Sequence, residues 1–268
     1  MRVLVNGREG GALDPADRGL QYGDGLFETI AVQGGSPRFL DWHLERLAEG
    51  ARRLGLRLPE IALLRAEIGS VCQEPQGVVK LILTRGTGGR GYRPRADAAT
   101  SRIVSAWPWP DREPRAWTEG VRLGWCRTRL GRNPALAGIK HLNRLEQVLA
   151  RAEWDDERMD EGLMRDEQDQ VISATQANLF ARIAGRWVTP ALDQCGVSGV
   201  MRRAFRSWSG DMDDPVIERA LPASDLAAAT GLVLTNALIG AWPVREFAGR
   251  KLALESSVER FNAWLARQ

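Results

Sequence analysis

A proline-rich segment near the middle of the sequence most strongly constrains how this chain can fold. Pro108, Pro110 and Pro114 lie close together there. Proline fixes φ, lacks a backbone N–H and disfavours helix at the residue before it, so neither a central strand nor a helix interior fits. An extended linker is the expected structure. We therefore predict an N-terminal domain over residues 1–107, a linker over 108–115 and a C-terminal domain over 116–268.

The composition is typical of a globular protein. Of the 268 residues, 44% are hydrophobic and 26% are charged, which is enough apolar material for two modest cores. The most apolar window, Leu226–Trp242, is broken by polar residues and glycines, so we expect a buried strand and no membrane span. No secretory signal precedes the strand-like run Arg2–Asn6. The cysteines are Cys72, Cys126 and Cys195; their odd number and their spacing suit a reduced cytoplasmic protein without a metal site.

Charge and residue scarcity narrow the candidate chemistry. The net charge is only +3, which argues against nucleic-acid binding. The only histidines are His43 and His141, which argues against a histidine metal site. The only lysines are Lys80, Lys140 and Lys251. Chemistry that needs a lysine amine therefore has three candidates.

Hydrophobic periodicity predicts an antiparallel sheet with helices in the N-terminal domain. The dipeptide Asn6-Gly7 is typical of a tight hairpin. Asp41 is suited to cap a helix with apolar residues at helical spacing, and His43 is expected on its polar side. A second helix is expected after Pro59. The strand-like runs are Arg2–Asn6, Leu26–Val32, Pro37–Leu40, Val78–Arg85 and Arg102–Trp107.

The C-terminal domain also mixes strands and helices, so the predicted fold class is α+β with two domains. Helices are expected over Asn143 to Asp155, Val200–Trp208 and from Ser256 onward. Strands are expected at Val121–Cys126, Leu163–Arg165, Val171–Ser173, Asn178–Ile183, Trp187–Val188 and Leu232–Thr235.

A glycine-rich loop over residues 86–91 matches the GxGxxG pattern of dinucleotide-binding folds. That pattern needs a helix directly after the loop. Here Tyr92, Pro94 and another strand follow. A hairpin loop that carries Arg90 is the better interpretation, and a plain glycine turn stays open.

Lys140 lies after a loop and before a helix, in the segment Gly138–Glu146. A lysine that forms a covalent bond with a carbonyl cofactor needs a lowered pKa. From periodicity alone, a solvent-exposed lysine is the simpler interpretation.

The order and content of several segments resemble the fold-type IV pyridoxal-phosphate (PLP) enzymes, which include aminodeoxychorismate lyases and branched-chain and D-amino-acid transaminases. Within this group, Lys140–Gln147 and Arg85–Tyr92 resemble the lyases. The matching segments are Asp17–Thr29, His43–Leu47, Gly138–Leu149, Ala177–Phe180, Gly196–Arg202 and Thr235–Leu238.

The resemblance implies a cofactor site for PLP. Lys140 is implied to bind the cofactor covalently, and Arg46 to pair with its phosphate. The backbone N–H groups of Val200 and Met201 are suited to cradle the same phosphate. Asn236 or Ala237 is implied to close that pocket.

The resemblance also implies a small substrate with carboxylates, aminodeoxychorismate, which is cleaved to 4-aminobenzoate and pyruvate for folate biosynthesis. Lys80 and Arg90 are implied to bind the carboxylates. Tyr22 is implied to line the same site, and Thr29 to position a proton. A homodimer is implied as well.

The sequence departs from the family at Ser173, where most relatives place a glutamate that holds the pyridine nitrogen of PLP. A carboxylate keeps that nitrogen protonated, whereas a hydroxyl holds it weakly. Transamination needs more electron storage than elimination, so Ser173 favours a lyase. Two alternatives stay open: a D-amino-acid or branched-chain transaminase, and a PLP-binding protein without turnover.

Overall fold

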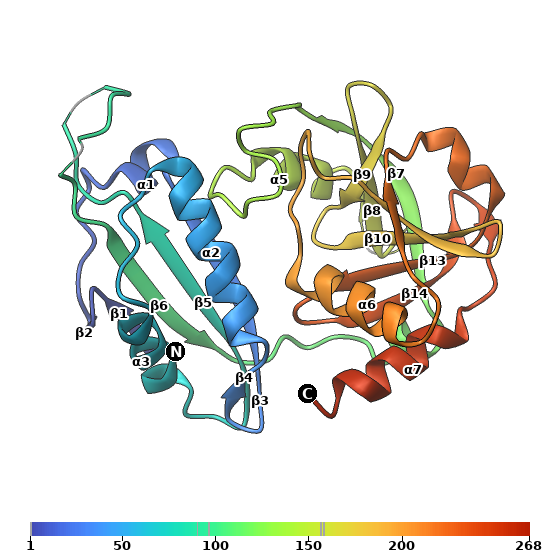
Figure 1. Ribbon diagram of the computed structural model, residues 1–268, viewed down its shortest axis with the longest axis horizontal. Coiled ribbons are helices and arrows are strands. Elements are labelled where there is room, and N and C mark those ends of the chain that lie inside the picture. Colours follow the sequence, from blue (N-terminus) through green and yellow to red (C-terminus); the bar gives the residue numbers. More distant parts are fainter. Residues whose placement is uncertain (1, 90, 96, 156, 158) are drawn as a thin grey trace. The chain divides into compact units, whose positions relative to one another are not determined.

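The computed structural model describes residues 2–89, 91–95, 97–155, 157 and 159–268 (Figure 1). They form two compact units: unit 1 is Met1–Asp111 with Ile139–Asn143, and unit 2 is Arg112–Gly138 with Arg144–Gln268. The chain first passes from unit 1 to unit 2 within the segment 108–115. The segment around Lys140, which we had assigned to the C-terminal domain, groups with unit 1 because its backbone hydrogen-bonds to a strand there.

Unit 1 is built on one sheet with helices packed against it. The strands are β1 (Arg2–Val5), β2 (Arg8–Glu9), β3 (Gly25–Gln33), β4 (Ser36–Pro37), β5 (Gln76–Thr84) and β6 (Ser101–Trp107). The helices are α1 (Arg18–Tyr22), α2 (Leu40–Leu54) and α3 (Ile61–Val71). The strand order is β2-β1-β6-β5-β3-β4. Helix α2 packs along β3, and α3 contacts β1, β5 and β6 (Figure 1).

Helix α2 covers one face of β3 because both elements present apolar residues there. Leu26 and Ile30 of β3 and Leu47 of α2 are almost completely buried. The predicted capping role of Asp41 is wrong: the N-cap is Phe39, it makes no side-chain cap bond, and Asp41 lies in the first turn.

The glycine-rich loop after β5 leads into an antiparallel partner strand, β6, and not into a helix. The phosphate of a dinucleotide would therefore find no helix N-terminus behind this loop. The hairpin interpretation of the segment is confirmed.

Unit 2 contains a larger sheet of order β12-β11-β10-β13-β14-β7-β8-β9, with β15 paired to β14. The strands are β7 (Val121–Leu130), β8 (Glu161–Asp166), β9 (Val171–Ala174), β10 (Asn178–Ile183), β11 (Arg186–Pro190), β12 (Ile217–Arg219), β13 (Ala229–Asn236), β14 (Gly240–Phe247) and β15 (Arg250–Lys251). The helices are α4 (Arg115–Thr118), α5 (Leu145–Arg151), α6 (Val200–Asp211), the 3-10 helix η1 (Ala223–Ala228) and α7 (Ser256–Leu265). Both units combine helices with largely antiparallel strands, so the predicted α+β class is confirmed.

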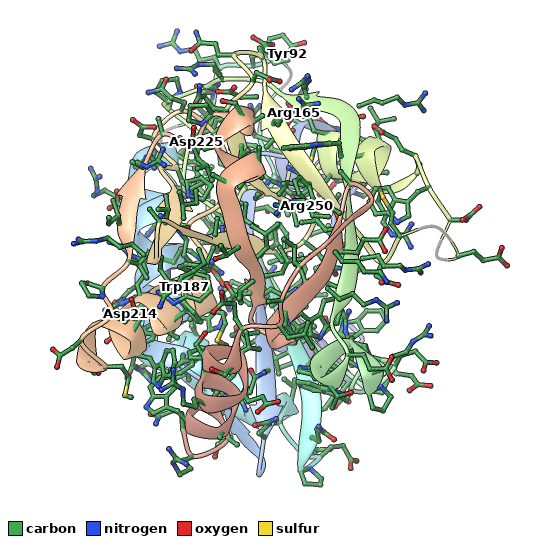
Figure 2. The ribbon with its side chains drawn as sticks, turned by 90° about the vertical axis from the view of Figure 1, so that its right-hand side faces the viewer. Tyr92, Arg165, Trp187, Asp214, Asp225 and Arg250 are labelled. Atoms are coloured by element: carbon green, nitrogen blue, oxygen red, sulfur yellow. The ribbon has the colours of Figure 1, made fainter. Side chains whose placement is uncertain are left out.

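An aromatic cluster fixes α6 and α7 on this sheet. The ring of Phe205 lies 4.4 Å from that of Phe180, 5.0 Å from that of Phe261 and 5.6 Å from that of Trp187, between ring centroids. Trp187 is fully buried, and Figure 2 shows where it lies in unit 2. Such rings bury large apolar areas, so they hold the middle of α6 against β10.

Candidate active site

The segment that carries Lys140 runs as an extra strand along the beginning of β3. The N–H of Phe27 donates to the carbonyl oxygen of Lys140 at 3.0 Å, and the N–H of Leu142 donates to the carbonyl of Gly25 at 3.0 Å. A Cβ atom at Gly25 would lie 2.5 Å from the carbonyl oxygen of Leu83 and 2.9 Å from Leu142 Cδ1. Glycine is therefore required where β3, β5 and the lysine segment approach one another.

Two lysine amines lie near the same aromatic ring. Lys140 Nζ is 4.3 Å, and Lys80 Nζ is 5.5 Å, from the ring centroid of Phe27. Lys80 is the cross-strand partner of Thr29, so these side chains share a face of the sheet with Phe27. The structure thus brings together Lys140, Lys80 and Thr29. Phe27 lies in the strand that resembles the family, but we did not single it out from the sequence.

The opposite face of β3 carries a buried polar cluster of Glu28, His43 and Arg46. His43 Nδ1 lies 2.6 Å from Glu28 Oε2, and Arg46 Nε donates to Glu28 Oε1 at 2.9 Å. Arg46 Nη2 also bonds to Glu28 Oε2. The side chains of Glu28 and His43 are each only 1% exposed. The expectation that His43 lies on the polar side of its helix is wrong, because a carboxylate on β3 lets the imidazole be buried.

The pKa values of this cluster follow from burial and from the nearby charges. Burial raises the pKa of Glu28, but the charge of Arg46 and the hydrogen bonds from His43 and Arg46 outweigh it and hold that pKa at about 2. Burial lowers the pKa of His43 despite the carboxylate beside it. His43 is therefore neutral at neutral pH, and its Nδ1–H donates to the ionised Glu28. Arg46 is the cation that balances this carboxylate.

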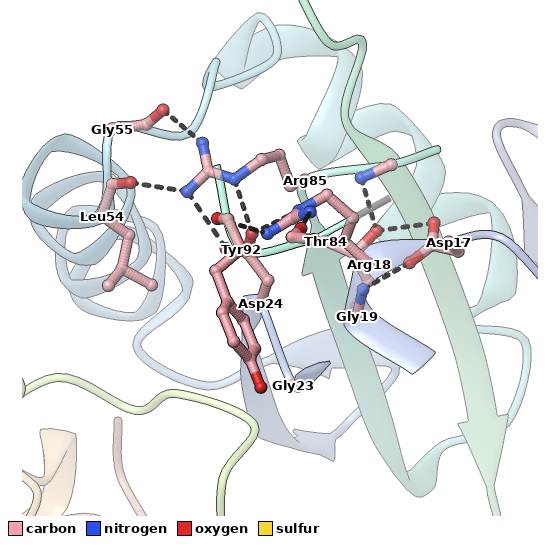
Figure 3. Close-up of polar contacts among 12 residues, drawn as sticks. Asp17, Arg18, Gly19, Gly23, Asp24, Leu54, Gly55, Thr84, Arg85 and Tyr92 are labelled. Atoms are coloured by element: carbon pink, nitrogen blue, oxygen red, sulfur yellow. Dashed lines mark hydrogen bonds and ion pairs between the residues drawn. The ribbon is translucent and has the colours of Figure 1, made fainter. Parts of the chain in front are cut away.

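The glycine-rich loop begins at a network around Asp24, which Figure 3 shows. Arg85 donates to the Asp24 carboxylate from Nε at 2.7 Å and from Nη2 at 3.0 Å, and Arg18 Nε donates at 3.0 Å. Arg85 also donates to the carbonyl oxygens of Leu54 and Gly55 at 2.7 and 2.8 Å. The residue directly before the loop, Arg85, is therefore tied to the C-terminus of α2.

The far end of the loop is held by Arg18. Its guanidinium donates to the carbonyl oxygens of Gly91 at 2.8 Å and Tyr92 at 3.0 Å, and it lies 4.8 Å from the ring centroid of Tyr22. The rings of Tyr22 and Tyr92 are 5.6 Å apart. Arg90, a predicted substrate-binding residue, lies outside the described residues.

In unit 2, the turn before α6 presents unpaired backbone N–H groups. Among the residues that the structure describes, the N–H groups of Val200 and Met201 have no hydrogen-bond acceptor, and the N-cap Gly199 supplies no side chain. A Cβ atom at Gly199 would lie 2.1 Å from Asn178 Oδ1. Asn178 Nδ2 donates to the carbonyl of Val197 at 2.9 Å, which fixes the turn. N–H groups at a helix N-terminus favour an anion.

The turn after β13 is ordered by Asn236. Its Oδ1 accepts from the N–H groups of Leu238 and Ile239, both at 2.9 Å, and its Nδ2 donates to the carbonyl of Gln176 at 3.1 Å. The side chain of Asn236 is thus used within the protein. Ala237, at the tip of the turn, has only backbone groups to offer.

Ser173 lies on β9 opposite Met164 of β8, and its hydroxyl makes no hydrogen bond within the described part of the chain. The buried carboxylate of Glu161 lies earlier on β8, and the alternation of side chains directs it to the other face of the sheet. Glu161 Oε1 accepts from the hydroxyl of Thr175 at 2.5 Å. Glu161 therefore does not replace the carboxylate that Ser173 lacks.

The part of the chain that the structure describes contains neither a metal-binding cluster nor a membrane-spanning helix. No group of three or more His, Cys, Asp and Glu side chains there is arranged to hold a metal ion. None of the helices there is both long enough and apolar enough to cross a bilayer.

Comparisons with known proteins agree with the resemblance. Residues 25–247 match the amino-transferase class IV family. An aminodeoxychorismate lyase of Vibrio harveyi is 36% identical over 90% of this chain and 89% of its own length. The crystal structure of a 4-amino-4-deoxychorismate lyase from Pseudomonas aeruginosa is 45% identical, covers 99% of this chain and 98% of its own, and has a TM-score of 0.95.

A branched-chain amino acid aminotransferase of Escherichia coli shares the fold at a TM-score of 0.89, with 20% identity over 97% of this chain and 92% of its own. Together with the family match over most of the sequence, these similarities confirm the fold-type IV architecture. The chain belongs to the amino-transferase class IV family of PLP-dependent enzymes.

Proposed function

We propose that this chain is an aminodeoxychorismate lyase, which converts 4-amino-4-deoxychorismate to 4-aminobenzoate and pyruvate and so serves folate biosynthesis. The observation that carries the proposal is its similarity, over nearly the whole chain, to two lyases of this name from different bacteria. The transaminase of E. coli supports the fold alone.

Each unit offers groups that suit PLP. In unit 1, Arg46 is a cation suited to the phosphate. In unit 2, the N–H groups of Val200 and Met201 are suited to an anion, and the crowded Gly199 leaves no room for a side chain beside them. The turn ordered by Asn236 offers the backbone of Ala237 to the same group. Lys140 provides the amine that binds the cofactor covalently, and Ser173 is assigned to the pyridine nitrogen.

Five side chains are assigned to the substrate: those of Lys140, Lys80, Arg90, Tyr22 and Thr29. When bound, PLP supplies an electron acceptor next to the carbon that carries the substrate nitrogen. The incoming substrate amine would displace the Lys140 amine from the cofactor, and the freed Nζ would then take the proton from that carbon. Lys80 and Arg90 bind the substrate carboxylates, and Tyr22 lines the same site. The hydroxyl of Thr29, beside Lys80, positions the proton that the leaving enolpyruvyl group needs to become pyruvate.

The test is product formation by the purified protein. We expect 4-aminobenzoate and pyruvate in equal amounts from aminodeoxychorismate, a yellow protein, and a visible absorbance that borohydride abolishes. Lys140→Ala should lose turnover and bind PLP only loosely, whereas Lys251→Ala, on the exposed β15, should behave as wild type. A borohydride-reduced adduct mapped by mass spectrometry to Lys80 or Lys251 would contradict the assignment.

A transaminase of the same fold is the second candidate, and Ser173 is the observation that disfavours it. A hydroxyl stabilises a protonated pyridine nitrogen less than a carboxylate does. Mixing the PLP-loaded protein with D-alanine or a branched-chain amino acid should leave most of the cofactor in its aldehyde form. Full conversion to the amine form would favour the transaminase, and PLP binding without any product would favour a non-catalytic protein.

We also propose a cytoplasmic homodimer. Leu145, Val148 and Leu149 of α5 are 75%, 59% and 61% exposed and lie on one face of the helix, as an interface between two copies requires. The three cysteines are unpaired, which agrees with a reducing compartment. Light scattering should give twice the mass of one chain for the wild type. Leu149→Glu should shift the mass to that of the monomer.

A further inference from the structure

We infer that Glu28 and His43 are positioning residues, which hold the guanidinium of Arg46 in the orientation that receives the cofactor phosphate. The inference rests on the proposed function, in which Arg46 binds that phosphate. It goes further by assigning a role to two residues that the proposed function leaves without one.

The hydrogen bonds of the cluster fix Arg46 along one edge. Glu28 accepts from Nε at 2.9 Å and from Nη2, so the carboxylate and the guanidinium meet as two parallel forks. An arginine side chain otherwise samples many rotamers, and this contact selects one of them. The other edge of the planar group is then directed away from Glu28.

His43 fixes the carboxylate in turn. Its Nδ1 lies 2.6 Å from Glu28 Oε2, the same oxygen that bonds to Arg46 Nη2. Because His43 is neutral and donates from Nδ1, it holds Glu28 without adding a second cation. His43 therefore orients the carboxylate of Glu28, and Glu28 orients the guanidinium of Arg46.

A merely structural role explains this cluster poorly. On the same face of β3, the neighbours Leu26 and Ile30 are apolar and almost fully buried. Apolar residues in place of a buried ion pair are often neutral or stabilising. The Arg46 side chain is 13% exposed while Glu28 is 1% exposed, so the cation is the member of the pair that an anion from outside can reach.

The test measures two affinities of the apoprotein, for PLP and for pyridoxal, which lacks the phosphate. Glu28→Asp keeps the charge but shortens the side chain, so it cannot reach both partners. His43→Leu removes the donor, and His43→Asn is the matched control, since its amide nitrogen takes the place of Nδ1. We expect Glu28→Asp and His43→Leu to raise the Kd for PLP about tenfold and the Kd for pyridoxal less than about twofold. His43→Asn should stay within about threefold of wild type for both ligands.

The outcomes separate this inference from the proposed function. If Arg46→Ala leaves the Kd for PLP unchanged, the phosphate role of Arg46 fails, and the inference fails with it. If Arg46→Ala weakens PLP binding but Glu28→Asp and His43→Leu do not, or weaken both ligands equally, the positioning role alone is overturned. Should Glu28→Asp fail to fold, the comparison of His43→Leu with His43→Asn decides the question.

Discussion

Replacing Arg85 by methionine should destabilise unit 1 more than any single exposed ion pair could. The Arg85 side chain is 11% exposed, and it makes two bonds to Asp24 and one each to the carbonyls of Leu54 and Gly55. Charge-assisted hydrogen bonds contribute about 1.5–3 kcal/mol each but are not additive. Asp24 also keeps its bond to Arg18. We therefore expect the free energy of unfolding to fall by about 2–4 kcal/mol.

Urea denaturation followed by tryptophan fluorescence measures this loss, with Arg95→Met as the matched control. Arg95 pairs with Asp97 in an ion pair whose side chains are 64% and 71% exposed, so solvent screens the two charges and Arg95→Met should unfold close to the wild-type urea midpoint.

The loss should also depend on pH. Burial raises the pKa of Asp24, but the bonds from Arg85 and Arg18 outweigh it and lower the pKa below 3.8. When the pKa of a carboxyl group is lower in the folded than in the unfolded protein, its ionised form stabilises the fold at any pH above the unfolded-state pKa. This stabilisation is lost as the pH falls through the folded-state pKa. The difference between wild type and Arg85→Met should therefore shrink below pH 3.8. A loss no larger than that of Arg95→Met, or one that is unchanged in acid, would refute the reasoning.

Three further predictions concern the two units separately. Ser173→Glu should raise side transamination, measured as conversion of PLP to its amine form. Ser173→Ala should change lyase activity little, because a neutral hydrogen bond contributes about 0.5–1.5 kcal/mol. Equal transamination in wild type and Ser173→Glu would count against the assignment of Ser173 to the pyridine nitrogen. Gly199→Ala should weaken PLP binding in a spectroscopic titration, since the new Cβ would lie 2.1 Å from Asn178 Oδ1. An unchanged affinity would contradict this prediction, because it would show that the turn can move to accommodate the methyl group. The pKa of Glu28 is lowered from 4.5 to about 2, so its ionised carboxylate should add on the order of 3 kcal/mol to the free energy of unfolding above pH 4.5. This contribution should be lost as the pH falls through about 2. In Glu28→Gln, the free energy of unfolding measured in urea should therefore decrease less between pH 4.5 and pH 2 than it does in the wild type.

Local patterns were sufficient to predict much of the fold. Apolar runs beside glycine turns predicted β3, β5 and β6, and the dipeptide Asn6-Gly7 forms the expected turn, with φ of 51° and 79°. Patterns were less informative where an element is short or apolar throughout. Helix α1 spans only five residues and was not predicted, and β14 lies partly in an apolar window that also suits a helix. The helix expected over Asn143 to Asp155 is shorter, Leu145–Arg151.

The buried cluster shows why the site could be predicted only in part. Lys140 and Thr29 lie in segments that resemble the family, and the resemblance also implied a role for Lys80. The structure places both lysine amines near the ring of Phe27, with Thr29 opposite Lys80. His43 was misassigned because its burial depends on Glu28, which lies on another element. A pattern along one helix reports which face is apolar, but it contains no information about a carboxylate that a neighbouring strand brings to that face.

The chain returns to unit 1 for only the five residues Ile139–Asn143. This return limits where the protein can be cut into fragments and sets when unit 1 can finish folding during synthesis. A fragment that ends at Asp111 lacks the partner of Phe27 and Gly25, so the beginning of β3 would have an open edge that invites pairing with another chain. On the ribosome, unit 1 stays incomplete until residue 143 has emerged. Lys140, the lysine that we propose to carry the cofactor, therefore lies in the last segment of unit 1 to be synthesised, and the sheet of unit 1 gains this extra edge only after residues 112–138 of unit 2 have been made.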